Sequence, residues 1–210
     1  MGGQAAAALR SVGLRSQASL NIVGLLLAAG SGSRFGSDKL RHVLPHGVPI
    51  AVQALRHLKA ELPNVLVVVR PGGEGLFEGE KVVVCPNADE GMGTSLACAA
   101  RAAARLFPDA DGYVIALGDM PFVRRTTIAA VRDALAAGAP LAAPYFRSRR
   151  GHPVGLSKRF YKDLSALRGD VGAKQLIREN EGTLVKIPVG DPGVIRDIDT
   201  PGDLAPPLRI

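Results

Sequence analysis

The chain has 210 residues, of which 47% are hydrophobic, and it carries a formal net charge of +7. This length suffices for one domain with a sizeable core. The charge bears on the partners of the protein, yet the sequence shows no zinc-finger spacing, no helix-turn-helix pattern, no basic patch interleaved with aromatic residues and no Trp. We therefore expect an anionic small-molecule substrate and no nucleic-acid partner.

The cysteines and the apolar runs indicate the compartment. Cys85 and Cys98 are too few and too isolated for a disulfide framework or a metal site. Arginines interrupt the alanine-rich segments, so no apolar run approaches the length of a membrane span. We expect a cytoplasmic protein without a membrane partner.

Residues 1–20 differ in composition from the rest, because they contain several Ala and Ser, two Arg and no acidic residue. A transit peptide, a disordered extension and an upstream start codon all fit this composition. We predict a disordered N-terminal extension over residues 1–20 and a single domain over residues 21–205.

The segment around which the chain is organised is a strand followed by a glycine-rich loop. Residues 22–29 are almost continuously apolar, as in a buried parallel strand, and the next ten residues contain three glycines and two basic side chains. Glycine backbones can aim consecutive N–H groups at phosphate oxygens. Arg34 can grip two oxygens with its planar fork, and Lys39 adds a compact charge. The sequence therefore predicts a phosphate-binding loop.

Two familiar phosphate-binding patterns do not fit this loop. Gly36 is followed by Ser, Asp and Lys, so the P-loop pattern fails. The dinucleotide pattern needs two residues between its last two glycines, whereas three separate Gly32 from Gly36. It also needs an acidic residue for the ribose, and none occurs between Asp38 and Glu61. A nicotinamide-dependent dehydrogenase is not expected.

After the loop, predicted helices and strands alternate. We expect helices over residues 50–58, 96–106 and 126–137, a helix that ends near residue 180, and strands over 65–69, 81–85, 112–117, 141–146 and 183–188. This order predicts a three-layer α/β domain in which helices cover both faces of a mostly parallel sheet. The late strands around Tyr145 and Lys186 are expected to form a small antiparallel excursion on the acceptor side.

Three aspartates are candidate metal ligands. Asp119 follows the strand over residues 112–117, and a carboxylate at the carboxyl end of a central strand can bind a metal ion beside the phosphate loop, although Gly-Asp-Met-Pro is also an ordinary turn sequence. Asp197 and Asp199 lie two residues apart, on one side of an extended segment, and either could reach a second face of the metal. We predict Asp119 and Asp199 as the ligands.

Three other segments contain possible helix caps or a concentration of positive charge. Thr94 or Ser95 can cap the helix over residues 96–106, whose N-terminal N–H groups would then face the phosphate loop. Residues 147–153 form the densest basic run, for which a solvated loop is the ordinary explanation. Asp170 is predicted as the N-cap of the helix that ends near residue 180.

The loop matches the nucleotidyltransferase signature L-A-A-G-x-G-x-R-x-G-x-x-K, at Leu27, Ala28, Ala29, Gly30, Gly32, Arg34, Gly36 and Lys39. From about residue 23 to 204 the chain resembles the MobA-like nucleotidyltransferase superfamily, and within it the molybdenum cofactor cytidylyltransferases. The motifs R-G-H-P, G-D-x-G-A and D-I-D-T-P-x-D-L also match. The resemblance implies a Rossmann-like nucleotidyltransferase fold.

The resemblance also implies roles for individual residues. Lys39, Arg34 and Asp119 would be catalytic, and Asp119 and Asp199 would hold Mg²⁺. The implied nucleotide contacts are Leu27, Ala28, Ala29, Gly30, Ser31, Gly32, Arg34, Lys39, Gly93 and Ser95. The implied acceptor contacts are Arg150, Gly151, His152 and Asp170.

The implied reaction is the transfer of CMP from CTP to the terminal phosphate of the molybdenum-carrying molybdopterin, with release of pyrophosphate. A molybdenum hydroxylase or its chaperone is the implied protein partner. A phosphate nucleophile is ionised at neutral pH and needs no general base, so positioning and charge neutralisation can suffice. The family's cytidylyltransferases carry A-A-G where its guanylyltransferases carry A-G-G, and the difference falls on Ala29.

Three alternatives remain open from the sequence. The protein could transfer GMP to molybdopterin, or a nucleotide to another phosphorylated acceptor such as a sugar or small-acid phosphate. It could also be a non-catalytic protein that binds and delivers a nucleotide or cofactor. The presence of both Lys39 and Asp119 favours an enzyme.

Overall fold

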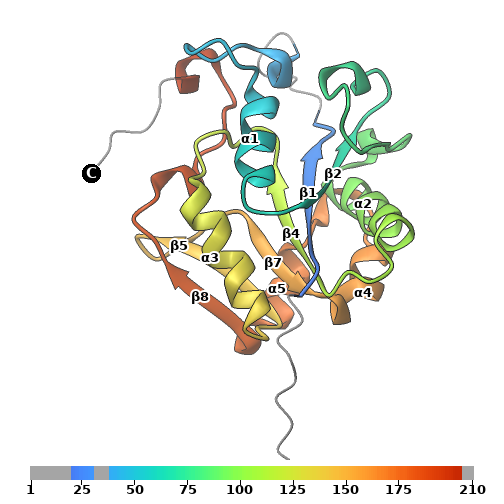
Figure 1. Ribbon diagram of the computed structural model, residues 1–210, viewed down its shortest axis with the longest axis vertical. Coiled ribbons are helices and arrows are strands. Elements are labelled where there is room, and N and C mark those ends of the chain that lie inside the picture. The colour runs from blue at the N-terminus through green and yellow to red at the C-terminus, as the bar shows by residue number, and fades with distance from the viewer. Residues whose placement is uncertain (1–19, 31–37, 205–210) are drawn as a thin grey trace, which may run out of the picture.

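The computed structural model describes residues 20–30 and 38–204 of the chain. Its centre is an eight-stranded sheet in the order β3-β2-β1-β4-β7-β5-β6, and β8 pairs with the opposite side of β5 (Figure 1). Apart from Leu20, the predicted N-terminal extension lies outside the described residues, so the domain limits stay a prediction. Within the described part of the chain, no helix combines the length and apolarity needed to cross a membrane.

The predicted elements agree closely with those of the structure. The strands are β1 (Ile22–Ala28), β2 (Asn64–Val69), β3 (Val82–Val84), β4 (Gly112–Leu117), β5 (Leu141–Phe146), β6 (Arg149–Arg150), β7 (Val154–Ser157) and β8 (Leu184–Pro188). The α-helices are α1 (Ile50–Lys59), α2 (Met92–Leu106), α3 (Arg125–Ala136), α4 (Tyr161–Ala166) and α5 (Lys174–Glu179). Short 3₁₀ turns connect several of them.

Strand β1 lies in the middle of the parallel part of the sheet, between β2 and β4, and all seven of its residues are buried. Because side chains alternate along a strand, Leu25 packs on one face with the alanines of α2. Leu26 packs on the other face with α1 and α3. Helices therefore cover both faces (Figure 1), and the predicted three-layer, Rossmann-like α/β fold is confirmed.

The antiparallel part of the sheet differs from the prediction. Strand β7 is antiparallel to β4 and β5, and β6 forms a short antiparallel ladder with β5. Strand β8, which contains Lys186, is parallel to β5, so its expected place in the antiparallel excursion is wrong. After β7 the chain passes through α4 and α5, so that β8 starts at the same end of the sheet at which β7 finishes. Strand β8 therefore runs opposite to β7 and along β5.

Two predicted helix caps are also wrong. Helix α2 begins at Met92 with Gly91 at the N-cap position, so Thr94 and Ser95 lie inside its first turn. Helix α5 begins at Lys174, and Asp170 lies in a separate 3₁₀ turn. The physical reason is the same in both cases, since Gly91 and Gly172 have positive φ angles and set the direction in which the helix starts.

The segment that follows β8 lies close to the loop that follows β4. Gly193 is buried against the backbone of Phe122, and a Cβ atom at residue 193 would lie under 3.0 Å from the Phe122 carbonyl. The buried carboxylate of Asp191 accepts hydrogen bonds from the Arg124 N–H at 2.8 Å and the Thr127 hydroxyl at 2.7 Å. These contacts attach the C-terminal segment to the start of α3.

Replacing Gly193 by Ala should therefore lower the free energy of unfolding by about 1–3 kcal/mol, because the added methyl group meets backbone rather than a flexible side chain. Urea denaturation measures this effect. Gly190→Ala is the matched control, since no atom lies within 4 Å of a Cβ at that position. Equal midpoints for the two variants would contradict this account of the packing.

Candidate active site

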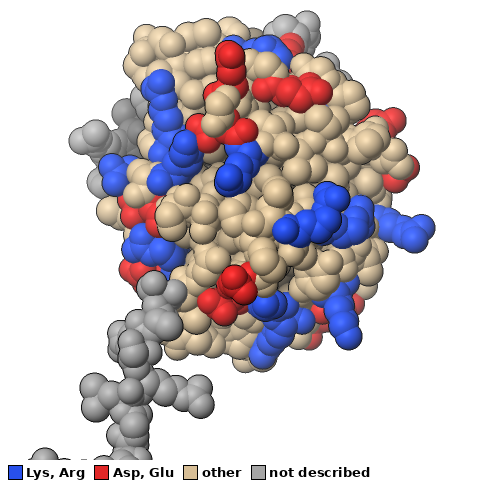
Figure 2. Space-filling model, turned by 45° about the vertical axis from the view of Figure 1, so that its right-hand side comes forward, with Lys and Arg blue, Asp and Glu red and all other residues tan. Residues whose placement is uncertain are grey.

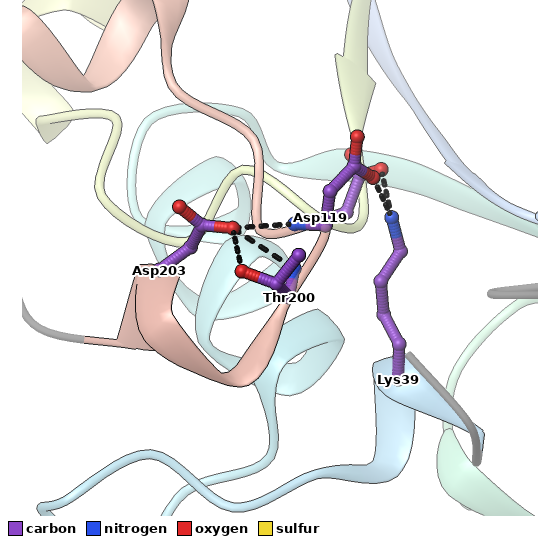
Figure 3. Close-up of polar contacts among 5 residues, drawn as sticks. Lys39, Asp119, Thr200 and Asp203 are labelled. Atoms are coloured by element: carbon purple, nitrogen blue, oxygen red, sulfur yellow. Dashed lines mark hydrogen bonds and ion pairs between the residues drawn. The ribbon is translucent and has the colours of Figure 1, made fainter. Parts of the chain in front are cut away.

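Lys39 connects three segments that are far apart in the sequence. Its Nζ lies 3.0 Å from Oδ2 of Asp119 and 2.9 Å from Oδ1 of Asp199 (Figure 3). Lys39 begins a 3₁₀ turn after the glycine-rich loop, whereas Asp119 follows β4 and Asp199 lies near the C-terminus. The structure thus brings together the predicted catalytic lysine and the two predicted metal ligands.

The ion pairs are partly shielded from water, and this shifts the ionisation of their members. The Lys39 residue is only 7% exposed. Burial raises the pKa of Asp119 above its ordinary value, although the positive charge of Lys39 opposes that shift. Burial acts to lower the pKa of Lys39, but Asp119 and Asp199 outweigh it, so the pKa of Lys39 is raised. Lys39 is therefore a permanently charged ammonium group at neutral pH.

A third carboxylate belongs to the same cluster. Ligand oxygens of Asp119, Asp197 and Asp199 all lie within 4.8 Å of one another. Ile198, between the last two, is fully buried, and its N–H donates a 2.9 Å hydrogen bond to the Asp119 carbonyl. Ile198 packs in a buried apolar cluster with Leu44 and Ile50, whereas the carboxylates on either side of it lie beside Asp119. The prediction that these two aspartates share one side agrees with the cluster, and Asp197 joins the two aspartates predicted as ligands.

Beside this cluster lies a cavity of about 480 Å³. Seven of the predicted site residues line it: Leu27, Ala29, Gly30, Lys39, Ser95, Asp119 and Asp170. Ala28 does not, because it packs on the opposite face of the sheet, with α1. Gly93 does not line it either, since it packs against the backbone of residues 168–169. Ser31, Gly32 and Arg34 lie outside the described residues, and their roles stay predictions.

A second cavity of about 280 Å³ adjoins the first and shares Leu27, Met92, Leu117 and Asp170 with it. Of the predicted acceptor contacts, Arg150, His152 and Asp170 line this second cavity. Gly151 does not, because it packs against Val194, where a Cβ atom would lie under 3.0 Å from the carbonyl oxygen. The two cavities therefore share one wall.

Sequence reasoning missed several residues that line the cavities. Arg70 and Asp89 line the larger cavity, and Lys174 lines the smaller one. A signal for Arg70 was present, since it directly follows β2 and the carboxyl ends of parallel strands meet at one edge. Lys174 carries no such signal, because its position depends on the turn at Gly172.

The histidine of the basic run is uncharged at neutral pH. Burial, with a smaller contribution from the charge of Arg150, lowers the pKa of His152 to about 4. Its Nδ1 atom is buried and has no hydrogen-bond partner among the described residues. His152 therefore contributes no positive charge to this cavity at neutral pH, whereas Arg150 and Lys174 do.

The charges elsewhere on the surface are dispersed. On the face that Figure 2 shows, Lys and Arg side chains form several separate groups, with acidic side chains among them and uncharged surface over much of the centre. This face carries no continuous basic patch of the kind that tracks a nucleic-acid backbone.

The family of the chain follows from comparison with known proteins. Residues 24–184 match the model of the MobA-like NTP transferase domain, and the chain belongs to this family. It is 31% identical over 196 residues to the purine catabolism protein PucB of Bacillus subtilis strain 168, an alignment that covers 86% of this chain and 92% of PucB. The protein is thus a nucleotidyltransferase of the MobA-like superfamily, as the signature motif predicted.

Solved structures support the same assignment. The crystal structure of Rv0371c from Mycobacterium tuberculosis H37Rv superposes with a TM-score of 0.76 at 25% identity, covering 88% of this chain and 95% of that one. A second structure of Rv0371c, in complex with manganese, superposes with a TM-score of 0.72 at 25% identity, covering 87% and 95%.

The shifted pKa of His152 gives a testable pH dependence of stability. In the unfolded chain a histidine takes up a proton near pH 6.5, whereas folded His152 stays neutral down to about pH 4. As the pH falls through this range the unfolded state binds more protons, so the free energy of unfolding decreases. The variant His152→Gln lacks this contribution and should lose less stability between pH 7 and pH 4 in urea titrations. Parallel pH dependences of wild type and variant would refute the explanation.

Proposed function

We propose that the protein transfers CMP from CTP to the terminal phosphate of the molybdenum-carrying molybdopterin cofactor. The observation that carries the proposal is the Lys39 ammonium group, held by Asp119 and Asp199 at the wall of a cavity large enough for a nucleotide. In the reaction an acceptor phosphate oxygen forms a bond to the α-phosphorus of CTP. The bond from that phosphorus to the β-phosphate oxygen breaks, and pyrophosphate leaves.

The chain's own residues supply positioning and charge. The acceptor phosphate is already an anion, so no side chain has to remove a proton from it. Lys39 places a fixed positive charge near the α-phosphate, where negative charge develops during the reaction. Because the ammonium group is already held in position, little free energy is spent on reorienting it when the reaction occurs. Arg34, which the signature motif places with the triphosphate, lies outside the described residues and is part of the proposal.

The carboxylate cluster fits a divalent cation, for which we propose Mg²⁺. Three carboxylates and one ammonium group leave a net charge of −2 in a small volume, and carboxylate oxygens are the ligands that Mg²⁺ and Mn²⁺ prefer. The manganese complex of Rv0371c supports this reading. When bound, such an ion would neutralise charge on the phosphate oxygens. Asp119, Asp197 and Asp199 would hold it.

The smaller cavity is the proposed acceptor site. Arg150 and Lys174 provide positive charge for a phosphate, and Leu96, Ile115, Val154 and Ile177 provide apolar walls for a ring system. The relative PucB acts in purine catabolism, so we propose that the client is a molybdenum hydroxylase of that process. Guanylyl transfer, a sugar or small-acid phosphate as acceptor, and a non-catalytic delivery protein are the competing outcomes of the experiments below.

Asp119→Asn is expected to reduce turnover by about a hundredfold or more while the fold stays intact, because it removes a charge from the ion-binding cluster without changing size. Pyrophosphate release with CTP, Mg²⁺ and molybdenum-loaded molybdopterin measures turnover, and thermal unfolding reports the fold. Asp163→Asn, at an exposed position on α4, is the control. Turnover of Asp119→Asn close to that of the wild type would remove this residue from the proposed site.

CTP is expected to be preferred over GTP by tens to hundreds of fold. Ala29 is 7% exposed and lines the larger cavity, so its methyl group takes up space that a purine would need. One such clash plus one unpaired polar edge costs about 1–3 kcal/mol. Pyrophosphate release from each of the four nucleoside triphosphates is the measurement, and Ala29→Gly should narrow the preference. If the wild type turned over GTP as fast as CTP, the cytidylyl assignment would be refuted, but the assignment of the protein as a nucleotidyltransferase would stand.

A further inference from the structure

Asp203 holds the turn that carries Asp199. One oxygen of its carboxylate, Oδ2, accepts three hydrogen bonds: from the Asp199 N–H at 3.3 Å, the Thr200 N–H at 2.9 Å and the Thr200 hydroxyl at 2.8 Å (Figure 3). Asp203 belongs to a 3₁₀ turn over Pro201–Leu204, so it reaches back over the turn to bind the two residues that precede it. All three donors lie at or next to a residue of the carboxylate cluster.

The carboxylate of Asp203 is well suited to this contact. An aspartate carboxylate ordinarily carries its negative charge at neutral pH, and hydrogen bonds to a charged acceptor are about twice as strong as neutral ones.

The backbone of Asp199 is fixed on both sides. On the N-terminal side, Ile198 is buried and donates to the Asp119 carbonyl. On the C-terminal side, the Asp203 carboxylate accepts a hydrogen bond from the Asp199 N–H. The Arg196 guanidinium closes the turn, since it donates to the Asp203 carbonyl at 3.2 Å and lies over the Phe122 ring at 5.4 Å.

The side chain of Asp199 needs such support, because it is 44% exposed, whereas that of Asp119 is 25% exposed. An exposed residue on an unsupported turn samples several backbone conformations, and a bound cation must then order it at an entropic cost. A preformed turn removes part of that cost. Groups that orient a metal ligand in this way typically change metal affinity by about 10–100-fold.

We propose that Asp203 is a positioning residue for the divalent-cation site, which orders the Asp199 turn so that its carboxylate faces those of Asp119 and Asp197. This inference rests on the proposed function, because it assumes that these three carboxylates bind the cation. Asp203 itself is not a proposed ligand, since its Oδ2 oxygen is occupied by the three hydrogen bonds.

The test is a titration of the full chain with Mn²⁺ alone, in which electron paramagnetic resonance measures the bound and free Mn²⁺. Asp203→Ala should weaken Mn²⁺ binding by about tenfold or more. Asp203→Asn keeps an oxygen acceptor but loses the charge, so its affinity for Mn²⁺ should lie between those of the wild type and Asp203→Ala. Thr200→Val removes one of the three hydrogen bonds and should have the smallest effect. Asp163→Ala is the control for the loss of an exposed carboxylate and should bind as the wild type does.

Circular dichroism at the titration temperature ensures that only fully folded variants are compared. Mn²⁺ affinity of Asp203→Ala equal to that of the wild type would overturn the inference, and so would a wild type that binds no Mn²⁺. If Asp203→Ala does not fold, the comparison of Asp203→Asn and Thr200→Val with the wild type decides the question. A wild type that binds Mn²⁺ in an Asp203-dependent manner but releases no pyrophosphate would refute the proposed function and leave this inference standing.

Discussion

The ion pairs of Lys39 with Asp119 and Asp199 are the contact on which the site depends. They join residues 80 and 160 positions apart in the sequence, and the lysine that makes them is almost completely buried. Burying an ammonium group and carboxylates costs desolvation energy that their attraction only partly offsets, so such a cluster is poor evidence for stability. Three carboxylates within 4.8 Å would repel one another strongly without a cation among them. The arrangement is therefore best understood as a site that requires positive charge, which Lys39 supplies in part.

The fold delivers these groups by simple geometry. Strands β1 and β4 are adjacent and parallel, so Gly30, with which the glycine-rich loop begins, and Asp119 lie at the same edge of the sheet. The third part, the segment with Asp197 and Asp199, pairs with no strand among residues 20–30 and 38–204 and depends on local contacts instead. Ile198 is buried in a small cluster with Leu44 and Ile50, and Gly193 allows close approach to Phe122. The site is thus built from two rigid strand ends and one segment that is attached by packing.

This difference explains what could be predicted from the sequence. Long apolar runs such as β1 and β4 are strong signals, and the rule that parallel strands end at one edge places Asp119 beside the loop. Glycine geometry was not predictable, and it decides where α2 and α5 begin and hence where Ser95 and Asp170 lie. The direction of β8 depends on a long connection through α4 and α5, which no local pattern encodes. Asp203 stands in a matched motif, but only the closed turn reveals what its carboxylate binds.

The distribution of charge between the two cavities follows from the same construction. The larger cavity is lined by Lys39 and Asp119 of the carboxylate cluster, and a divalent cation bound there would balance the net charge of −2 that the cluster carries. The smaller cavity has Arg150 and Lys174 but a neutral His152, so its positive charge comes from groups with flexible stems near the surface. The wall shared by both cavities contains Leu27 and Leu117, which lie at or next to the ends of β1 and β4, so apolar side chains on two rigid strands separate the two cavities there.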